Sequence, residues 1–167
     1  MVPNPTRILV PTDFSATADT ALSYAKGLAE RLGASLHLVH VLTDVYASAT
    51  YVPEVYAPIP AEARERALAE AQERLCDRLN AEEEQRFQGS RAVVSGLTAK
   101  EIVNYASQQH INLIVMGTHG RRGVAHLILG SVAEHVVRIS HCPVLTVPQA
   151  QLEAVNPLAE AAAGAAA

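Results

Sequence analysis

The chain has no tryptophan, only two phenylalanines and only two cysteines among its 167 residues. The cysteines, Cys76 and Cys142, are too few for a disulfide framework, and neither belongs to a Cys-x-x-Cys pair. The lack of a basic stripe argues against a nucleic-acid partner, and the scarcity of aromatic rings argues against platforms on which bases could stack. No apolar run approaches the roughly 20 residues of a membrane-spanning helix. Since the N-terminus also lacks a basic region followed by a long apolar run, we expect a soluble, cytoplasmic protein without a membrane partner.

The histidines and acidic residues follow no known metal-binding spacing. The chain has no His-Glu-x-x-His sequence and no cluster of cysteine and histidine. His37 and His40 lie three positions apart in a predicted strand, so their side chains should point to opposite faces of the sheet. We therefore expect no metal site built from side chains alone.

Apolar residues, in contrast, are plentiful. They make up 49% of the chain against 18% charged residues, and the net charge is −4. This balance and this length suit one globular domain with a sizeable buried core, which we assign to residues 1–148. The remaining segment, 149–167, is rich in alanine and continues no pattern, so we expect it to fray.

Strand-like and helix-like segments alternate along the domain. Each predicted strand is a short run of apolar and β-branched residues, and each predicted helix repeats its apolar residues at steps of three and four. We expect a loop at 43–60, strands at 7–12, 35–42, 90–96, 111–116 and 142–148, and helices at 16–32, 61–87, 98–109 and 131–140. This alternation predicts an α/β fold with a doubly wound, parallel five-stranded sheet and helices on both faces.

The same periodicity predicts which side chains are buried. Helix 16–32 should bury a stripe of alanines and leucines and should end at Gly33. Further buried positions are expected at Leu68, Ala71, Leu75 and Leu79 with Cys76 beside them, at Val132, Val136 and Val137, and at Cys142.

Two predicted strands end in sequences that could hold a polar ligand, "PTDFS" after the first and "MGTHGRRGVAHLILGS" after the fourth. The second has the spacing Gly-x2-Gly-x9-Gly-Ser. Without a Cβ, Gly117 and Gly120 can take positive φ and let the backbone approach an anion. Gly130 and Ser131 fall at the start of a predicted helix, where unpaired N–H groups and the helix dipole favour a phosphate. The loop is therefore a candidate anion site.

The residues alone also allow a simpler interpretation of the loop than an anion site, in which the glycines only form a turn and Ser131 only caps the helix. The loop is not a P-loop, because no lysine precedes Ser131, and the dinucleotide fingerprint would follow the first strand instead. Ser131 is a poor nucleophile candidate, because a nucleophile elbow needs glycine where the chain has Leu129. Asp13 could bind a ligand or merely cap the first helix, although Ser15 is better placed to cap it.

The pattern "VMGTHG…LGS", together with "ILVPTDFS" near the start and "HCPVLTVP" near the end, resembles the universal stress protein family over roughly residues 5–148. Gly-x2-Gly-x9-Gly-Ser marks the ATP-binding branch of that family, and this chain keeps every position. The resemblance implies a Rossmann-like sheet with strand order 3-2-1-4-5, in which the first and fourth strands are neighbours. Ligands of such sheets bind where the strand order reverses.

The resemblance also implies roles for individual residues. ATP would place its phosphates, with Mg²⁺ or Mn²⁺ bound through them, at the glycine loop. The implied residues are Gly117, Gly120, Gly130, Ser131 and Val132 for the phosphates, Asp13 for the ribose hydroxyls with Pro11 and Thr12 as the adjoining wall, and Val41 and Met116 for the adenine. His119 could contact a phosphate or serve only as a turn residue, and Arg121 and Arg122 could neutralise phosphates or stay solvated.

The implied function is that of an ATP-binding universal stress protein, a nucleotide-dependent switch in the stress response that hydrolyses ATP slowly or not at all. The family pairs subunits through the last strand, so we expect a homodimer through 142–148, and a protein partner that the sequence does not identify. One alternative is a dimeric interaction module of the same fold that does not bind nucleotide. Another is a nucleotide-hydrolysing enzyme, although the HxGH, KMSKS and SGGxD signatures of such relatives are absent.

Overall fold

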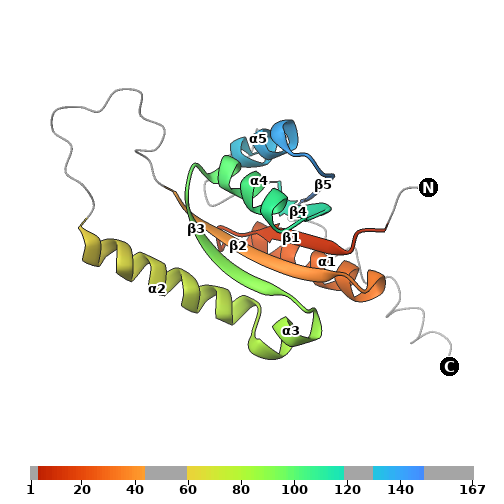
Figure 1. Cartoon of the computed structure of the whole chain (residues 1–167), viewed down its shortest axis with the longest axis horizontal. Coiled ribbons are helices and arrows are strands. Elements are labelled where there is room, and N and C mark those ends of the chain that lie inside the picture. Colours follow the sequence, from red (N-terminus) through yellow and green to blue (C-terminus); the bar gives the residue numbers. More distant parts are fainter. Residues whose placement is uncertain (1–3, 44–59, 119–129, 149–167) are drawn as a thin grey trace, which may run out of the picture.

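The structure, a computed structural model, describes residues 4–43, 60–118 and 130–148 (Figure 1). The strand boundaries fall within two residues of the predicted ones. Among the described helices, none is long and apolar enough to cross a membrane. The expected loop and the expected frayed tail lie outside the described residues, apart from the two ends of the loop. The elements are, in chain order, β1 (Arg7–Pro11), α1 (Ala16–Leu32), β2 (Ser35–Thr43), α2 (Ala61–Arg78), α3 (Ala81–Arg86), β3 (Ser90–Gly96), α4 (Thr98–Gln108), β4 (Leu113–Gly117), α5 (Ser131–Ile139) and β5 (Val144–Val147).

The strands of the described residues form one parallel sheet in the order β3-β2-β1-β4-β5, which confirms the expected order. In the register of the sheet, Ile8 of β1 lies between Leu36 of β2 and Leu113 of β4. The order of the strands reverses between β1 and β4. The carboxyl ends of these two strands therefore lie side by side, at the position where sheets of this kind bind ligands.

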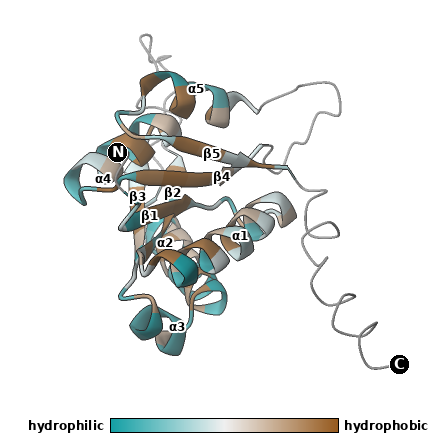
Figure 2. Cartoon of the chain, turned by 90° about the vertical axis from the view of Figure 1, so that its right-hand side faces the viewer, coloured by the Kyte–Doolittle hydropathy of each residue, from teal (hydrophilic) through white to brown (hydrophobic). Residues whose placement is uncertain are grey.

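Helices cover both faces of the sheet (Figure 2). Ile8 and Val10 of β1 belong to the core beneath α1 and α2, whereas Leu9 belongs to the core beneath α4 and α5. All three side chains are fully buried, although they point to opposite faces. Burial on both faces explains why the strands appear in the sequence as unbroken apolar runs.

The ends of α1 follow from local chemistry. The Ser15 hydroxyl accepts a hydrogen bond from the Ala18 N–H at 3.2 Å, which caps the first turn. Gly33 ends the helix in the left-handed conformation, with φ of 64°, which glycine adopts at little cost. Both features match the predicted helix 16–32. Most of its predicted inner stripe is buried, and Leu28 and Leu32 are partly buried.

The single helix expected over 61–87 is wrong, because the segment forms two helices. α2 ends at Arg78, and Leu79 has an extended backbone. The side chain of Asn80 accepts from the Glu83 N–H at 2.9 Å, and the Glu83 carboxylate accepts from the Asn80 N–H at 3.3 Å. This capping box stabilises a new helix start at α3 and so interrupts the longer helix that the periodicity predicts.

The first ten residues of α2, 61–70, are exposed, and there the helix extends beyond the sheet (Figure 1). Burial begins at Ala71 and continues at Leu75. Leu68, expected in the buried stripe, is 38% exposed, and Cys76, expected to pack, is exposed as well. Periodicity identifies the apolar side of a helix, but it does not show how far the helix runs past its neighbours.

Charged contacts fasten the second half of α2 to α1. The Lys26 ammonium donates to the carbonyl oxygen of Arg78 at 2.8 Å and to the carboxylate of Glu83 at 2.6 Å. The Arg78 guanidinium in turn donates to the Asp19 carboxylate at 2.7 Å. Burial alone would raise the pKa of Glu83, but the hydrogen bond and charge of Lys26 outweigh burial and lower it. The junction between α2 and α3 is therefore held in a fixed position on α1.

α5 is less buried than its sequence predicts. Val136 is fully buried, whereas Val132 and Val137, expected to be buried, are 37% and 49% exposed. Cys142, also expected to be buried, is partly exposed. The reason is the position of the helix. α5 packs against α4 and the edge strand β5, so that one of its sides has no neighbour among the described residues.

Candidate functional site

The residues after β1 form a turn that is fixed by short-range hydrogen bonds. The Thr12 N–H donates to a carbonyl oxygen of β2 at 2.8 Å, and the Thr12 hydroxyl accepts from the Phe14 N–H at 3.0 Å. The Asp13 carboxylate accepts from the Ser15 N–H at 3.0 Å, and Asp13 itself is half-buried. Pro11 and Thr12, the expected wall residues, are buried. Asp13 therefore stands at the carboxyl edge of the sheet in a defined orientation.

Asp13 is not the cap of α1, because Ser15 fills that role. The carboxylate of Asp13 instead supports the turn through the Ser15 N–H. A carboxylate offers about four acceptor positions, which allows it to accept hydrogen bonds from more than one group. The position suits the role expected for Asp13, which is to accept hydrogen bonds from hydroxyl groups of a ligand.

Gly117, at the end of β4, lies very close to the first turn of α1. A Cβ at this position would lie 2.8 Å from Cγ2 and 3.0 Å from the carbonyl oxygen of Thr17. Among the described glycines only Gly33 and Gly96 have positive φ, so Gly117 does not use the positive φ that a glycine can adopt. At Gly117 the missing Cβ allows β4 to approach α1 closely. Gly120 lies outside the described residues.

Gly130 occupies the N-cap position of α5, with φ of −67° and ψ of 150°. Glycine has no side chain that could cap the helix, and because the N-cap is not Ser131, the alternative in which Ser131 caps the helix is wrong. The Gly130 N–H donates to the carbonyl oxygen of Thr118 at 2.6 Å. This hydrogen bond joins the end of β4 to the start of α5. Gly117 and Ser131, which are far apart in the motif, therefore lie close together in the structure.

The start of α5 has the properties of an anion-binding site. The first N–H groups of a helix have no intrahelical acceptor, and the dipole places partial positive charge there. Val132 lies in this first turn and is exposed. His119, Arg121 and Arg122, which could contact a phosphate, lie outside the described residues.

The two residues expected to meet an adenine, Val41 and Met116, are 7% and 5% exposed. Both belong to the core between the sheet and α4 and α5. Their side chains are thus largely engaged in packing. A base at this edge would contact mainly the backbone of Val41, which is the contact that the family resemblance implies.

Sequence reasoning missed Phe14 and His40, which complete the turn after β1. The Phe14 ring lies 4.4 Å from the His40 ring, centroid to centroid. His40 Nδ1 lies 2.7 Å from the carbonyl oxygen of Thr12, and because a carbonyl only accepts, Nδ1 donates. An aromatic residue after a strand gives no sequence signal of this arrangement.

His37 lies on the other face of the sheet from His40, as predicted. Its Nδ1 is 2.9 Å from the Ser90 hydroxyl and 3.2 Å from the Tyr105 hydroxyl, so the three side chains connect β2, β3 and α4. Burial lowers the pKa of His37 from its ordinary value of 6.5, and the charge of Arg7 lowers it further. Among the described residues no group of three histidine, cysteine or acidic side chains could hold a metal ion.

The lowered pKa of His37 should make the protein less stable in acid. Below pH 6.5 the unfolded chain binds a proton at His37 that the folded protein does not bind, so the free energy of unfolding falls as pH drops through this window. Urea unfolding of wild type and of His37→Gln between pH 7.5 and 5 measures this effect. The variant should show the shallower dependence, and His135→Gln, at an exposed position of α5, is the matched control. Equal slopes for wild type and His37→Gln would contradict the assignment.

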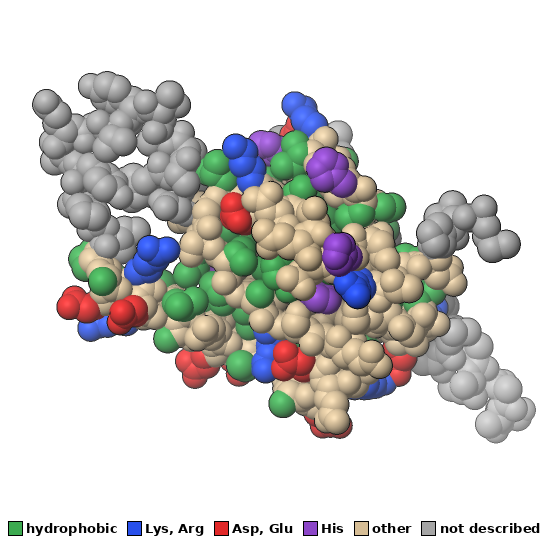
Figure 3. Space-filling model, viewed as in Figure 1, with side chains coloured by type: hydrophobic (Ala, Val, Ile, Leu, Met, Phe, Trp, Pro, Cys, Tyr) green, Lys and Arg blue, Asp and Glu red, His purple; other side chains and the backbone are tan. Residues whose placement is uncertain are grey.

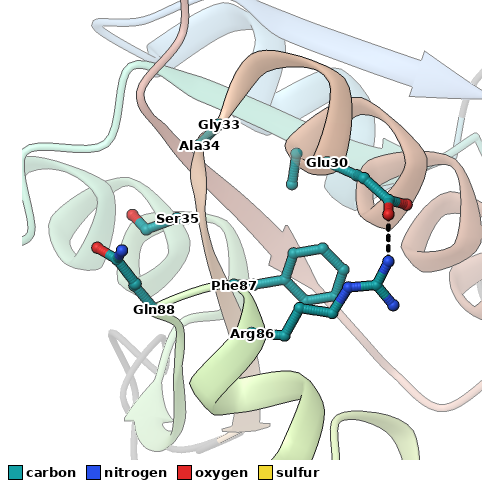
Figure 4. Close-up of a pocket in the computed structure, with 8 residues that line it drawn as sticks. Glu30, Gly33, Ala34, Ser35, Arg86, Phe87 and Gln88 are labelled. Carbon is teal, nitrogen blue, oxygen red and sulfur yellow. Dashed lines mark hydrogen bonds and ion pairs between the residues drawn. The ribbon is translucent and has the colours of Figure 1, made fainter.

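A shallow depression of about 220 Å³ lies at the amino end of β2, away from the carboxyl edge of the sheet (Figure 4). The ion pair between Glu30 and Arg86 lies in it, and Phe87 and Ser35 line it. Sites for small molecules usually enclose about 300–1,000 Å³, so this depression is small for a ligand. On the face shown in Figure 3, acidic and basic side chains are interspersed along α2 and α3. The candidate site remains the carboxyl edge of β1 and β4.

Comparison with known proteins agrees with the fold. A sequence model of the universal stress protein family matches residues 5–148. Universal stress protein MJ0531 of Methanocaldococcus jannaschii is 32% identical over 152 residues, which cover 88% of this chain and 84% of that protein. Universal stress protein YxiE of Bacillus subtilis is 32% identical over 147 residues, which cover 84% of this chain and 97% of that protein.

Solved structures show the same architecture. The structure of MJ0577, from Methanocaldococcus jannaschii, superposes with a TM-score of 0.74 at 29% identity and covers 87% of this chain and 97% of its own. The structure of UspA from Lactobacillus plantarum gives a TM-score of 0.71 at 27% identity and covers 87% and 99%. With a family model that spans most of its length and relatives above 30% identity, the chain belongs to the universal stress protein family.

Proposed function

We propose that the protein binds ATP at the carboxyl edge of β1 and β4 and acts as a nucleotide-dependent switch in the stress response. The observation that carries the proposal is the hydrogen bond between Gly130 and Thr118. It places the first turn of α5 beside the end of β4, next to the strand whose turn presents Asp13. The proposed anion site and the carboxylate proposed to bind hydroxyl groups thus share one edge of the sheet, as a nucleotide requires.

Each part of the nucleotide would meet a different part of this edge. The phosphates would accept hydrogen bonds from the first N–H groups of α5, with the Ser131 hydroxyl as a further donor. The ribose hydroxyls would donate to Asp13. The adenine would lie against the backbone of Val41 near Met116. Pro11 and Thr12 would form the wall between ribose and base, and Gly117, His119 and Gly120 would line the phosphates.

A divalent cation, Mg²⁺ or Mn²⁺, fits this arrangement only as a partner of the phosphates. Among the described residues, the site contributes N–H groups and one carboxylate, that of Asp13 in the turn after β1, whereas these cations prefer several oxygen ligands. Phosphate oxygens would supply most of those ligands. The cation would neutralise the phosphate charge that the helix dipole offsets only in part.

We also propose that hydrolysis is slow or absent. An attacking water needs a base within hydrogen-bond reach, and in this proposal the Asp13 carboxylate is engaged by the ribose hydroxyls and not by a water at the terminal phosphate. Slow turnover would leave the bound nucleotide in place as a signal. A protein partner would then recognise the nucleotide-bound state.

The edge strand β5 supports a further part of the proposal, a homodimer through 142–148. In the single chain only Val147 of this strand is buried, whereas Val144, Leu145 and Thr146 are partly exposed. An edge strand offers unpaired backbone groups to another chain. Such a dimer, acting in the cytoplasm, would also exist under the alternative in which the fold is an interaction module without nucleotide.

Proteins of this fold have been solved with nucleotides, one in complex with cAMP and one with dAMP. At 22% and 21% identity, these two share the fold with this chain and carry no argument about its ligand. The case for ATP rests on the motif and on the geometry of the carboxyl edge. It is therefore tested on this protein itself.

Calorimetric titration of nucleotide-free protein with ATP and Mg²⁺, AMP and adenosine tests the proposal. If the phosphates bind at α5, ATP should bind at least about tenfold more tightly than adenosine, since hydrogen bonds to charged groups contribute about 1.5–3 kcal/mol each. Equal affinities would place the phosphates elsewhere. Failure of all three to bind would favour the interaction module, and rapid release of phosphate from ATP would favour the hydrolysing enzyme.

A further inference from the structure

Phe14 has a backbone conformation that aromatic residues rarely adopt. Its φ of 65° lies in the left-handed region, where the Cβ crowds the following carbonyl oxygen. Gln88 and His110 also have positive φ, but both are exposed, whereas Phe14 is only 8% exposed. Strain of this kind persists only where the surroundings impose it, and it is concentrated at functional sites.

The surroundings of Phe14 come from two other elements. On β2, the His40 ring lies at 4.4 Å with an angle of 32° between the planes. On α2, the guanidinium carbon of Arg74 lies 4.1 Å from the centroid of the Phe14 ring, and that of Arg78 lies at 5.0 Å. These distances are those of cation–π contacts. The arginines of α2 therefore help to hold the ring where the left-handed backbone directs it.

The same groups fix the backbone on both sides of Asp13. His40 donates to the carbonyl oxygen of Thr12, and the Phe14 N–H donates to the Thr12 hydroxyl. The Asp13 carboxylate accepts a hydrogen bond from the N–H of Ser15, the residue that directly follows the left-handed Phe14. A change of Phe14 to the ordinary right-handed conformation would turn that N–H and the carboxylate with it.

We propose that Phe14 and Arg74 are positioning residues that orient Asp13 toward the ribose hydroxyls, so that the docking of α2 controls how the site recognises a ribonucleotide. This inference rests on the proposed function and adds its regulation. Arg78, tied to Asp19 of α1, supports the same ring from a fixed point. Arg74 is the adjustable member, because its side chain is 34% exposed and its own carboxylate partner, Glu70, lies at 3.9 Å.

A purely structural role for Phe14 predicts a different result. Loss of a core ring would then lower the stability of the protein and lower its affinity for every ligand of the site to a similar extent. A positioning role predicts a selective loss, confined to the interaction with the ribose hydroxyls. The comparison of ATP with 2′,3′-dideoxy-ATP, which lacks both hydroxyls, separates the two.

The experiment titrates wild type, Phe14→Leu, Arg74→Met and Arg74→Lys with ATP and with 2′,3′-dideoxy-ATP. Arg66→Met, at an exposed position of the same helix, is the matched control. We expect Phe14→Leu and Arg74→Met to lower the preference for ATP by about fivefold or more, because a hydrogen bond to a carboxylate depends on its geometry. Affinity for the dideoxy nucleotide should change less than about twofold. Arg74→Lys keeps a cation over the ring and should retain the preference, as should the control.

An unchanged preference for ATP in Arg74→Met would overturn the proposal, and this variant alters only a partly exposed side chain. Equal losses for both nucleotides in Phe14→Leu and Arg74→Met would overturn it as well and would leave Phe14 a core residue. If wild type binds neither nucleotide, the proposed function fails and this inference fails with it. If wild type binds both nucleotides equally, ATP binding stands, but Asp13 does not bind the ribose hydroxyls and this inference is wrong.

Discussion

Replacement of Gly130 by aspartate should lower the affinity for ATP by at least about 100-fold, which corresponds to about 2.7 kcal/mol. Gly130 has φ of −67° and ψ of 150°, an ordinary extended conformation that aspartate adopts without strain. Aspartate is also one of the best N-cap residues. Its carboxylate would accept hydrogen bonds from the N–H groups that the phosphates would otherwise use, and its charge would repel the phosphates. The protein should therefore keep its fold while it loses its ligand.

Gly130→Asn is the control that separates charge from shape. Asparagine has nearly the same size and caps a helix equally well, but it carries no charge. Calorimetric titration should show a much smaller loss of ATP affinity for Gly130→Asn than for Gly130→Asp. Thermal unfolding should show both variants at least as stable as wild type. Undiminished ATP binding by Gly130→Asp would mean that the phosphates do not lie at the start of α5.

Replacement of Gly117 by alanine should lower the free energy of unfolding by about 1–3 kcal/mol, the usual cost of overpacking. The new Cβ would lie 2.8 Å from Cγ2, 3.0 Å from the carbonyl oxygen and 3.1 Å from the carbonyl carbon of Thr17. Thr17 is buried in the first turn of α1. Relief would therefore require that the start of α1 move away from β4. Urea unfolding curves of wild type and variant give the difference directly.

A double variant tests whether Thr17 is the cause. Thr17→Ser removes Cγ2 and keeps the hydroxyl, so it should recover part of the loss in Gly117→Ala but not all, because the backbone atoms of Thr17 remain close. Gly27→Ala is the matched control, since a Cβ at this exposed position of α1 would meet nothing within 4 Å. That change should stabilise the protein by about 0.5–1 kcal/mol. Wild-type stability of Gly117→Ala would contradict the close contact between β4 and α1.

The order of the elements could be predicted from the sequence because the central strands are buried on both faces and most of the helices are amphipathic. The break between α2 and α3 was missed, since the apolar period continues through Leu79. The signal was nevertheless present. Asn80 followed by Glu83 has the spacing of a capping box, which stabilises a helix start even within a segment of high helix propensity. Local hydrogen bonding here outweighs periodicity.

The candidate site could be predicted only in part. Its motif identifies Gly117 and Gly130, but a glycine needed for positive φ and a glycine needed for close approach are identical in a sequence. The structure shows close approach to Thr17 at Gly117 and a hydrogen bond to Thr118 at Gly130. The kink at Phe14 had no sequence signal at all, because it depends on groups from β2 and α2 that are distant along the chain.

The most direct test of the central claim is to denature the purified protein and identify the nucleotide that it releases. We expect wild type to release an adenine nucleotide, predominantly ATP, in an amount close to one per chain. Gly130→Asp, purified in the same way, should release none. Wild-type protein that is free of nucleotide and does not bind added ATP would contradict the claim, and the glycines of the motif would then serve only the packing of β4 and α5.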